Sequence, residues 1–289
     1  MGIVSAYKLV KQSIVAFTFK YNPVLDTSRP PRSFPTILGT GFVVREDGVI
    51  ATNAHVVRAF RKAPKPPTAP TDEYPVVATM LKMTEQGMLE IPLEVVGVTT
   101  IGSFNGGQAY YGPKDGPDLA FVHVKARGLP IVHIDGNTLV EEGMDLATAG
   151  FPMGTDALSA PGYLHQLTPT VQRGIVSAVL PFSCATPHGY SINLMSQGGA
   201  SGSPIFSCDT GSVLGVLYGG LNDIAHTLKG KDPYIVPTNI TYVVPSHYLV
   251  QALGEYAKNT DKDLPSDTKT IDEIIAQSKI VNALENGHD

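Results

Sequence analysis

The sequence of 289 residues has little net charge, few cysteines and no long apolar run. Its formal net charge of −5 offers no basic surface of the kind that binds nucleic acid. The longest apolar run, VLGVLYGGL, is far shorter than the ~18 residues that a membrane-spanning helix needs. We therefore expect neither a nucleic-acid partner nor a membrane span.

Cysteine usage argues against a disulfide framework and against a zinc site. Cys184 and Cys208 are the two cysteines, and no Cys/His cluster has zinc-site spacing. Two reduced thiols are favoured over a single bridge, although the sequence alone does not decide whether they pair. Lys8 and Lys11 interrupt the apolar N-terminus, so it lacks the continuous apolar segment of a signal peptide. We expect a cytoplasmic protein without metal or cofactor, whereas a trimmed chain would be compatible with a periplasmic or secreted one.

What the chain does contain is a series of short apolar or alternating runs, punctuated by Gly, Pro, Asn and Asp. About a dozen such runs with few helices are typical of an all-β barrel or sandwich. The Asp-Gly of REDGVI, between two of them, is a strong hairpin signal. The predicted strands are SIVAFTF, GTGFVV, GVIATNAHVV, PVVATMLK, IPLEVVGV, LAFVHVK, LATAGF, TVQRGIVSAVL, YSINLM, SPIF, SVLGVLYGG and ITYVV.

Two helices are predicted near the C-terminus. SHYLVQALGEYAKN places its apolar residues on one helical face, with Ser246 as the expected N-cap. A second helix opens with a capping box formed by Thr270 and Glu273. A helix of this length is marginal alone, so its apolar face needs a surface, either the chain's own strands or a neighbouring subunit. That face consists of Ile271, Ile274, Ile275, Val281 and Leu284.

Three separate motifs supply the residue types of a serine hydrolase. His55 lies in ATNAHVV, Asp118 precedes a strand in GPDLAFVHV, and several serines cluster in MSQGGASGSPIF. A serine hydroxyl is a weak nucleophile until an imidazole accepts its proton, and a carboxylate holds that imidazole in the required tautomer. The order His, Asp, Ser is that of the chymotrypsin-type triad and excludes an α/β-hydrolase, whose nucleophile comes first. Asp115 is the rival orienting acid, but its Gly/Pro-rich loop makes Asp118 the preferred residue.

The oxyanion site selects one serine from the cluster. In this geometry the donors are the backbone N–H groups of the nucleophile and of the residue two before it. Ser201 as nucleophile makes Gly199 the second donor, without a side chain to obstruct substrate. Ser203 is followed by Pro204, which restricts its backbone, and Ser196 lacks such a loop. Ser201 is therefore the predicted nucleophile.

Several of these blocks occur in the order found in one family. The blocks are GTGFVVREDGVIATNAHVV, LEVVGV, PDLAFVHV, LATAGFPMG, VQRGIVSAV and GGASGSPIF with SVLGVLYGG. Together they resemble the protease domain of the HtrA/Deg family of trypsin-like serine peptidases. The resemblance extends from about residue 14 to residue 253. It implies two six-stranded antiparallel β-barrels, an active site in the cleft between them, and endopeptidase activity without metal or nucleotide.

The resemblance also divides the chain. Residues 1–128 are expected to form the barrel that carries His55 and Asp118, and residues 129–258 the barrel that carries Ser201. Residues 259–289 would be a linker and an amphipathic helix. KARGLP, near the boundary between the barrels, is the expected hinge.

The chain departs from the family pattern in three places, and from trypsin at Ala200. Gly-Ala-Ser-Gly-Ser stands where the family usually has Gly-Asn-Ser-Gly-Gly, so the loop must accommodate the hydroxymethyl group of Ser203. The loops after His55 and before Asp118 are long and would cover the cleft. About thirty residues follow the match, too few for a PDZ domain, so we expect none. Ala200 replaces the acid that pairs with a new N-terminus in trypsin, which argues against activation by N-terminal cleavage.

The resemblance places the walls of the primary specificity pocket before and after the nucleophile. Those walls are Met195, Ser196, Gln197, Gly198, Leu217, Tyr218, Gly219 and Gly220, none of which is charged. The predicted function is a serine endopeptidase that prefers uncharged, mainly apolar residues before the cleaved bond of a protein or peptide. The alternative is a catalytically silent binding module with the same fold, and an esterase would use the same site. The family also implies a homo-oligomer, such as a trimer, formed through a barrel surface or the C-terminal helix.

Overall fold

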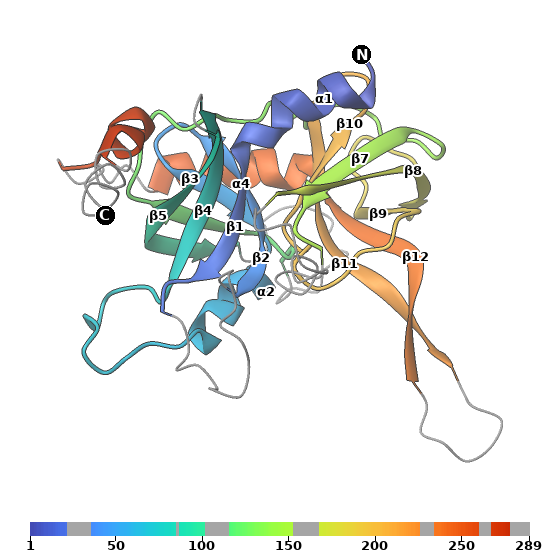
Figure 1. Ribbon diagram of the computed structural model, residues 1–289. Helices are drawn as coiled ribbons and strands as arrows, with labels where there is room; N and C mark the ends of the chain where they lie inside the picture. Colours follow the sequence, from blue (N-terminus) through green and yellow to red (C-terminus); the bar gives the residue numbers. More distant parts are fainter. Residues whose placement is uncertain are drawn as a thin grey trace.

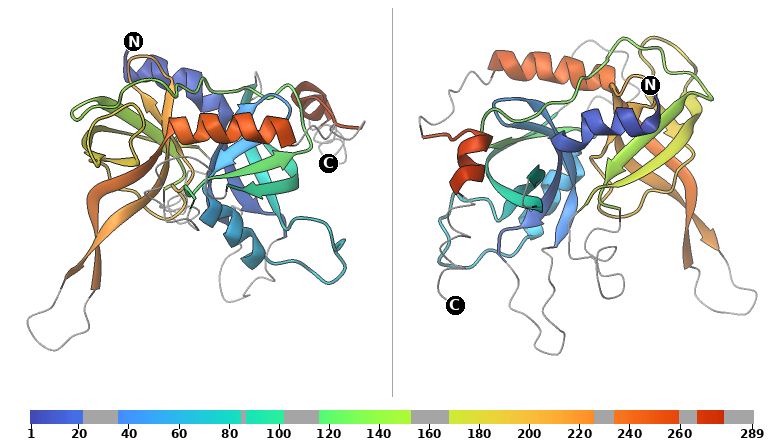
Figure 2. Two further views of the ribbon diagram at one scale, coloured as in Figure 1. Left: turned by 180° about the vertical axis from the view of Figure 1, so that it is seen from behind. Right: turned by 45° about the horizontal axis from the view of Figure 1, so that its top comes forward.

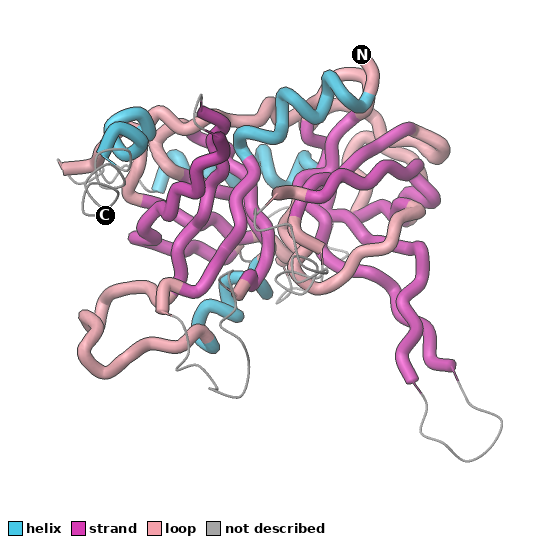
Figure 3. The backbone as a smooth tube through the Cα atoms, viewed as in Figure 1, coloured by secondary structure: helices cyan, strands magenta, loops and turns pink. Residues whose placement is uncertain are grey.

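Two closed barrels of six strands make up most of the protein. The computed structural model describes residues 1–21, 36–84, 87–101, 116–152, 168–225, 234–259 and 267–277. Within them the strands separate into two groups side by side (Figure 1; Figure 3). This confirms the predicted all-β fold. Among the described residues, no helix is both long and apolar enough to cross a membrane.

The first barrel has the strand order β1-β2-β3-β6-β5-β4, closed by pairing of β4 with β1, and the second has the order β10-β11-β12-β9-β8-β7. Neighbouring strands pair antiparallel. The bounds in the first barrel are β1 Ile14–Phe19, β2 Ile37–Arg45, β3 Val49–Thr52, β4 Val76–Thr84, β5 Gly87–Thr100 and β6 Ala120–Val124. Those in the second are β7 Asp145–Gly150, β8 Thr170–Leu180, β9 Gly189–Ile192, β10 Pro204–Ser207, β11 Val213–Ala225 and β12 Tyr234–Pro245.

Each strand coincides with a predicted apolar run, but several differ from it in length, and β5 extends beyond its run at both ends. β11 and β12 are longer than predicted, pair as far as Ala225 with Tyr234, and project from the second barrel as a two-stranded arm (Figure 1). β3 is shorter, because the run GVIATNAHVV ends its strand at Thr52 and continues as the helix α2 (Ala54–Ala59). His55 therefore lies on a helix rather than at the end of a strand.

Strands that face the junction of the barrels are buried on both sides, which explains why their sequences are almost continuously apolar. Successive side chains of a strand point to opposite faces. On β2, Phe42 belongs to the core between the barrels, whereas Val43 belongs to the core of the first barrel. On β10, Ile205 lies in the core of the second barrel and Phe206 in the core between the two. Each of these strands thus contributes to two cores at once.

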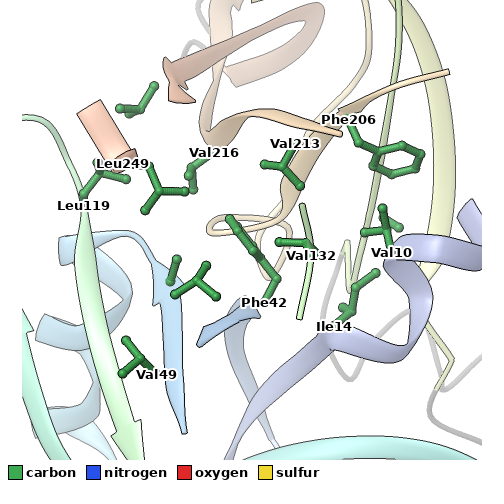
Figure 4. Close-up of a cluster of buried hydrophobic side chains, with 14 of the residues drawn as sticks. Val10, Ile14, Phe42, Val49, Leu119, Val132, Phe206, Val213, Val216 and Leu249 are labelled. Atoms are coloured by element: carbon green, nitrogen blue, oxygen red, sulfur yellow. The ribbon is translucent and has the colours of Figure 1, made fainter. Parts of the chain in front are cut away.

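The core between the barrels is formed by residues from both halves of the chain (Figure 4). Phe42 and Phe206 are fully buried in it. Burying a side chain of this size contributes roughly 1.5–3 kcal/mol relative to leaving it exposed. The barrels are therefore held together by apolar packing as well as by the connecting chain.

Both ends of the barrel region contribute helices to this junction. α1 (Ile3–Val10) continues into a 3-10 turn, η1 (Lys11–Ser13), and buries Ala6 and Val10 in the core between the barrels. α4 (Ser246–Asn259) lies across the junction of the barrels (Figure 2). The ring of its Tyr256 packs edge-on against Phe121 of the first barrel, with centroids 5.1 Å apart. α4 has the predicted bounds, and the hydroxyl of Ser246, the expected N-cap, donates to the carbonyl of Asp135 at 2.6 Å.

The connection between the barrels is hydrogen-bonded to both of them, just after the expected hinge at KARGLP. Val132 donates its N–H to Val43 O of the first barrel at 3.2 Å. The next residue, His133, accepts the N–H of Val213 from the second barrel at 2.8 Å. The barrel strands fall on either side of the predicted boundary between residues 128 and 129, and the boundary itself stays a prediction.

Residues 267–277 lie against the first barrel. Lys269 O accepts the N–H of Arg127 at 3.1 Å, and Ile271 N–H donates to Arg127 O at 2.9 Å. Residues 271–277 are helical, and Ile271 and Ile275 are buried in the core of the first barrel. The chain's own barrel therefore covers this part of the predicted apolar face, whereas Val281 and Leu284 lie outside the described residues.

The predicted capping box at the start of this helix is present. Thr270 N–H donates to Glu273 Oε2 at 2.7 Å, and Glu273 N–H donates to Thr270 Oγ1 at 3.2 Å. These reciprocal bonds satisfy two N–H groups that a helix start leaves without intrahelical partners.

Candidate active site

The predicted histidine and aspartate meet at the start of α2. His55 Nδ1 lies 2.5 Å from Asp118 Oδ2, and the backbone N–H of His55 donates to Asp118 Oδ1 at 3.0 Å. The Asp118 carboxylate thus binds the imidazole and also satisfies an N–H in the first turn of α2, a role usually taken by an N-cap side chain. Asn53 occupies the N-cap position without such a bond. Its amide instead donates to Asp118 O at 2.8 Å.

The contacts of Asp118 favour its ionised form. Burial acts to raise the pKa of its carboxyl, but hydrogen bonds and charge from His55, with a smaller contribution from Arg58, outweigh burial and leave this pKa below its ordinary value. Arg58 is exposed and its guanidinium lies 3.8 Å from Asp118 Oδ1. A carboxylate that remains charged can fix the tautomer of His55 with the proton on Nδ1, which leaves Nε2 free to act as a base.

Ser201 lies in a loop whose backbone is held from several directions. Ala200 N–H donates to Gln197 O at 3.0 Å and Gly202 N–H to Leu217 O at 2.9 Å. Gly199 and Gly202 have φ values of +93° and +86°, a region that favours glycine. A Cβ at Gly202 would also lie 2.1 Å from Thr40 O, so no side chain fits there.

The N–H groups of this loop divide into two classes. Those of Ala200, Gly202 and Ser203 donate to backbone carbonyls. Within the described part of the chain, the N–H groups of Gly199 and Ser201 have no such partner. These are the two groups that the sequence predicted as donors to an oxyanion.

The hydroxyl of Ser201 contacts the backbone of β11. Ser201 Oγ lies 3.4 Å from Tyr218 O, which accepts the serine's hydrogen bond among the described residues. The pKa of the Tyr218 hydroxyl is raised by burial, by Tyr242 and by the charge of Asp118. Among the described residues no hydrogen bond joins Ser201 Oγ to His55, so the hydroxyl would have to turn away from Tyr218 O to donate to the imidazole.

The additional hydroxymethyl group of Ser203 fits because a glycine faces it. Ser203 is 1% exposed, and its Oγ donates to Ala200 O at 2.6 Å. A Cβ at Gly150, the last residue of β7, would lie only 2.0 Å from Ser203 Oγ. The space that the serine occupies is therefore the space that Gly150 leaves open.

The two predicted walls of the specificity pocket lie against each other. A Cβ at Gly220 would be 2.8 Å from Ser196 Oγ, so the stretch before the nucleophile contacts β11. The ring of Tyr218 stacks on that of Tyr242, with centroids 6.0 Å apart. Met195 is exposed, and the side-chain amide nitrogen of Gln197 lies 3.5 Å from the Met195 sulfur. The groups on both walls that these contacts involve are uncharged.

Sequence reasoning missed two buried polar residues that contact the site. Thr40 on β2 bonds the loop of Ser201, and Asn53 bonds Asp118. Asn53 was visible as a polar residue two positions before His55, but nothing local marked Thr40. Asp115, the rival acid, lies outside the described residues, as do His165 and His226. Cys184 and Cys208 are both free thiols.

Comparison with known proteins agrees with this geometry. A family model described as a trypsin-like peptidase domain matches residues 39–216, which is more than half of the chain. A probable periplasmic serine endoprotease, DegP-like, from Halomonas elongata is 27% identical over 179 residues. The match covers 62% of this chain and 28% of that protein.

Two solved structures share the fold. The serine endoprotease from Yersinia pestis has a TM-score of 0.51 and 17% identity, and it covers 90% of this chain and 68% of its own. The HtrA-type protease AlgW with decapeptide has a TM-score of 0.52, 15% identity and the same two coverages. The family model, the curated relative and the paired barrels together confirm the resemblance seen in the sequence. The chain belongs to the trypsin-like peptidase domain family.

Proposed function

We propose that this protein is a serine endopeptidase in which Ser201 is the nucleophile, His55 the general base and Asp118 the residue that orients it. Two observations together support this proposal. Asp118 binds His55 through both carboxylate oxygens. In the nearby loop of Ser201, the N–H groups of Gly199 and Ser201 donate to no backbone carbonyl among the described residues and could bind an oxyanion. Nothing in mere peptide binding requires this combination.

The chemistry follows from these atoms. His55 Nε2 takes the proton of Ser201 Oγ as that oxygen attacks the peptide carbonyl carbon. The N–H groups of Gly199 and Ser201 stabilise the negative oxygen of the tetrahedral intermediate. The imidazolium then gives its proton to the leaving amine, and an acyl-enzyme remains. Water, deprotonated by the same imidazole, hydrolyses that ester and regenerates Ser201.

The rotation required of Ser201 is compatible with this assignment. Catalytic hydrogen bonds are often long or poorly aligned without substrate and tighten in the complex. The 3.4 Å contact with Tyr218 O is weak, so little is lost when the hydroxyl turns towards His55.

For specificity, we infer a preference for uncharged, mainly apolar side chains before the cleaved bond. The supporting observation is that both walls, Met195 to Gly198 and Leu217 to Gly220, lack charged residues. A buried Lys, Arg, Asp or Glu of the substrate would lose its hydration there without gaining a partner. A cleavage profile dominated by Arg or Lys would refute this preference.

The test of the activity is labelling by a fluorophosphonate probe, which reacts with activated serines, alongside cleavage of a peptide mixture. Ser201→Ala should abolish labelling and reduce kcat by about 10⁶, as loss of a triad serine does. Ser203→Ala is the matched control in the same loop and should keep most of the activity, because the backbone N–H of Ser203 still donates to Ala200 O. Unreactive wild-type protein that still binds peptides would instead support the alternative of a silent binding module.

Two further proposals concern the cellular compartment and the oligomeric state. The free thiols Cys184 and Cys208 are compatible with a reducing cytoplasm, whereas the curated relative's name places that protein in the periplasm. Fractionation of cells that express the natural gene would decide between the compartments. A homo-oligomer such as a trimer would use a barrel surface, since the barrel itself covers Ile271 and Ile275. Light scattering would measure it.

A further inference from the structure

Thr40 of the first barrel makes an unusual number of contacts with the loop of Ser201 in the second. Its side chain is fully buried. Its backbone N–H donates to Ser201 O at 2.9 Å, and its hydroxyl donates to Gly199 O at 2.8 Å. The proposed nucleophile and the residue two before it are thus both bonded by Thr40, which lies 159 positions from Gly199 in the chain.

The direction of the Thr40 hydroxyl is fixed by its other partner. Phe151 N–H, directly after β7, donates to Thr40 Oγ1 at 3.1 Å. An oxygen that accepts this hydrogen bond directs its own proton elsewhere, here to Gly199 O. Thr52 Oγ1 donates to Thr40 O at 2.7 Å and anchors the threonine within its own barrel. Every hydrogen-bonding group of Thr40 therefore has a partner with defined polarity.

These bonds hold the carbonyl groups around the nucleophile. Thr40 Oγ1 holds Gly199 O, Ser203 N and Oγ hold Ala200 O, and Thr40 N holds Ser201 O. The C=O and the following N–H of a planar trans peptide point in opposite directions. With Ala200 O held by Ser203, Ser201 N–H points to the other side. Gly199 O belongs to the Gly199–Ala200 peptide, which lies between the two donor N–H groups, so the bond from Thr40 fixes the segment that connects them.

We propose that Thr40 is a positioning residue that keeps the N–H groups of Gly199 and Ser201 directed at the oxyanion. The proposal rests on the proposed function and goes beyond it, because it assigns part of the active-site order to the other barrel. Packing of the two barrels and assembly of the oxyanion site are then coupled through one hydroxyl. The Thr40 backbone bond survives any substitution, so the side-chain bond can be tested alone.

Thr40→Val is the decisive variant, because valine has nearly the shape of threonine but no hydroxyl. It should lower kcat by about 10- to 100-fold, less than the 10²–10³ typical of removing an oxyanion donor outright. KM should change less than about threefold, because an interaction made mainly in the transition state affects kcat. A peptide aldehyde, which forms a tetrahedral adduct, should lose affinity by the same factor as kcat/KM. Thr40→Ser restores the hydroxyl and should recover most of kcat.

A matched control separates positioning from stability. Thr18 on β1 is also a buried threonine of the first barrel, and its hydroxyl bonds Thr79 Oγ1 at 2.9 Å; among the described residues it makes no hydrogen bond to the loop. Thr18→Val should lower the melting temperature, though less than Thr40→Val because one buried hydrogen bond is lost instead of two, and should leave kcat unchanged. Assays are run well below both melting temperatures, so loss of folded protein does not enter.

Each outcome decides the matter. A lower kcat in Thr40→Val, recovery in Thr40→Ser and a normal kcat in Thr18→Val would support the proposal. Normal kcat and normal aldehyde affinity in Thr40→Val, on a wild-type chain that labels at Ser201, would overturn the role of Thr40 alone. A wild-type chain that neither labels nor cleaves would overturn the proposed function and this role with it.

Discussion

The most direct test of how the nucleophile loop is packed is the substitution Gly150→Ala. The added Cβ would lie 2.0 Å from Ser203 Oγ, 2.9 Å from Thr40 Oγ1 and 3.1 Å from Ser203 Cβ. Ser203 is 1% exposed, so it cannot move into solvent without displacing other residues. Any rotation of its side chain also breaks the 2.6 Å bond from its hydroxyl to Ala200 O.

The magnitude follows from two costs and one gain. Overpacking a core position costs about 1–3 kcal/mol. Loss of a buried hydrogen bond adds roughly 1 kcal/mol. A Gly-to-Ala change in a compatible backbone would by itself stabilise the fold by about 0.4–1 kcal/mol through the unfolded state. We expect the free energy of unfolding to fall by about 2–3 kcal/mol on balance.

A second substitution identifies the cause. Ser203→Gly removes the Oγ at 2.0 Å and the Cβ at 3.1 Å, so Gly150→Ala should cost much less in its presence, with a coupling energy of about 1–2 kcal/mol in a double-mutant cycle. The contact with Thr40 Oγ1 remains, so the rescue should be partial. Urea unfolding followed by circular dichroism suits a chain without tryptophan. Gly189→Ala on β9, where a Cβ would meet its nearest atom at an ordinary 3.5 Å, is the control. The packing argument would be refuted if the effects of Gly150→Ala and Ser203→Gly on the free energy of unfolding were additive, or if Gly150→Ala left that free energy unchanged.

Three further outcomes are expected. Asp118→Asn should lower kcat by about 10⁴, because it permits the wrong tautomer of the His55 imidazole. The pKa of Asp118 is lowered in the folded state, so the stability that its ionised form contributes should be lost as pH falls below the ordinary carboxyl range. Melting temperatures of wild type and variant, measured against pH, would detect this loss. Burial, with the charge of His188, lowers the pKa of His247 to about 4, so stability should decline as pH falls from about 6.5 towards 4, and His247→Gln should flatten that part of the melting curve against pH. Ile271→Ala should reduce the free energy of unfolding by about 2 kcal/mol without changing the light-scattering mass. A change in mass would instead indicate that this face contributes to an interface between subunits.

Local sequence patterns determined the elements and predicted the residues of the candidate site. Apolar runs and turn residues predicted the twelve barrel strands. Residues two positions apart share one face of a strand, so a strand is recognised from a short stretch of sequence. The helix of residues 246–259 and the capping box at Thr270 were readable for the same reason, since helix contacts join residues three or four apart. His55, Asp118 and Ser201 were identified by residue type and order, because their chemistry requires those types.

Only the tertiary structure decided how distant segments complete one another. The carboxylate of Asp118 caps the first turn of α2 from 63 residues away, so the run through His55 becomes a helix after Thr52. Ser203 is accommodated because Gly150, on another strand, leaves its space empty. Thr40 reads as an ordinary strand residue, yet its hydroxyl bonds Gly199 across the junction of the barrels. Contacts of this kind depend on which strands become neighbours when the barrels close. That arrangement is a property of the whole chain, and a short stretch of sequence carries no trace of it.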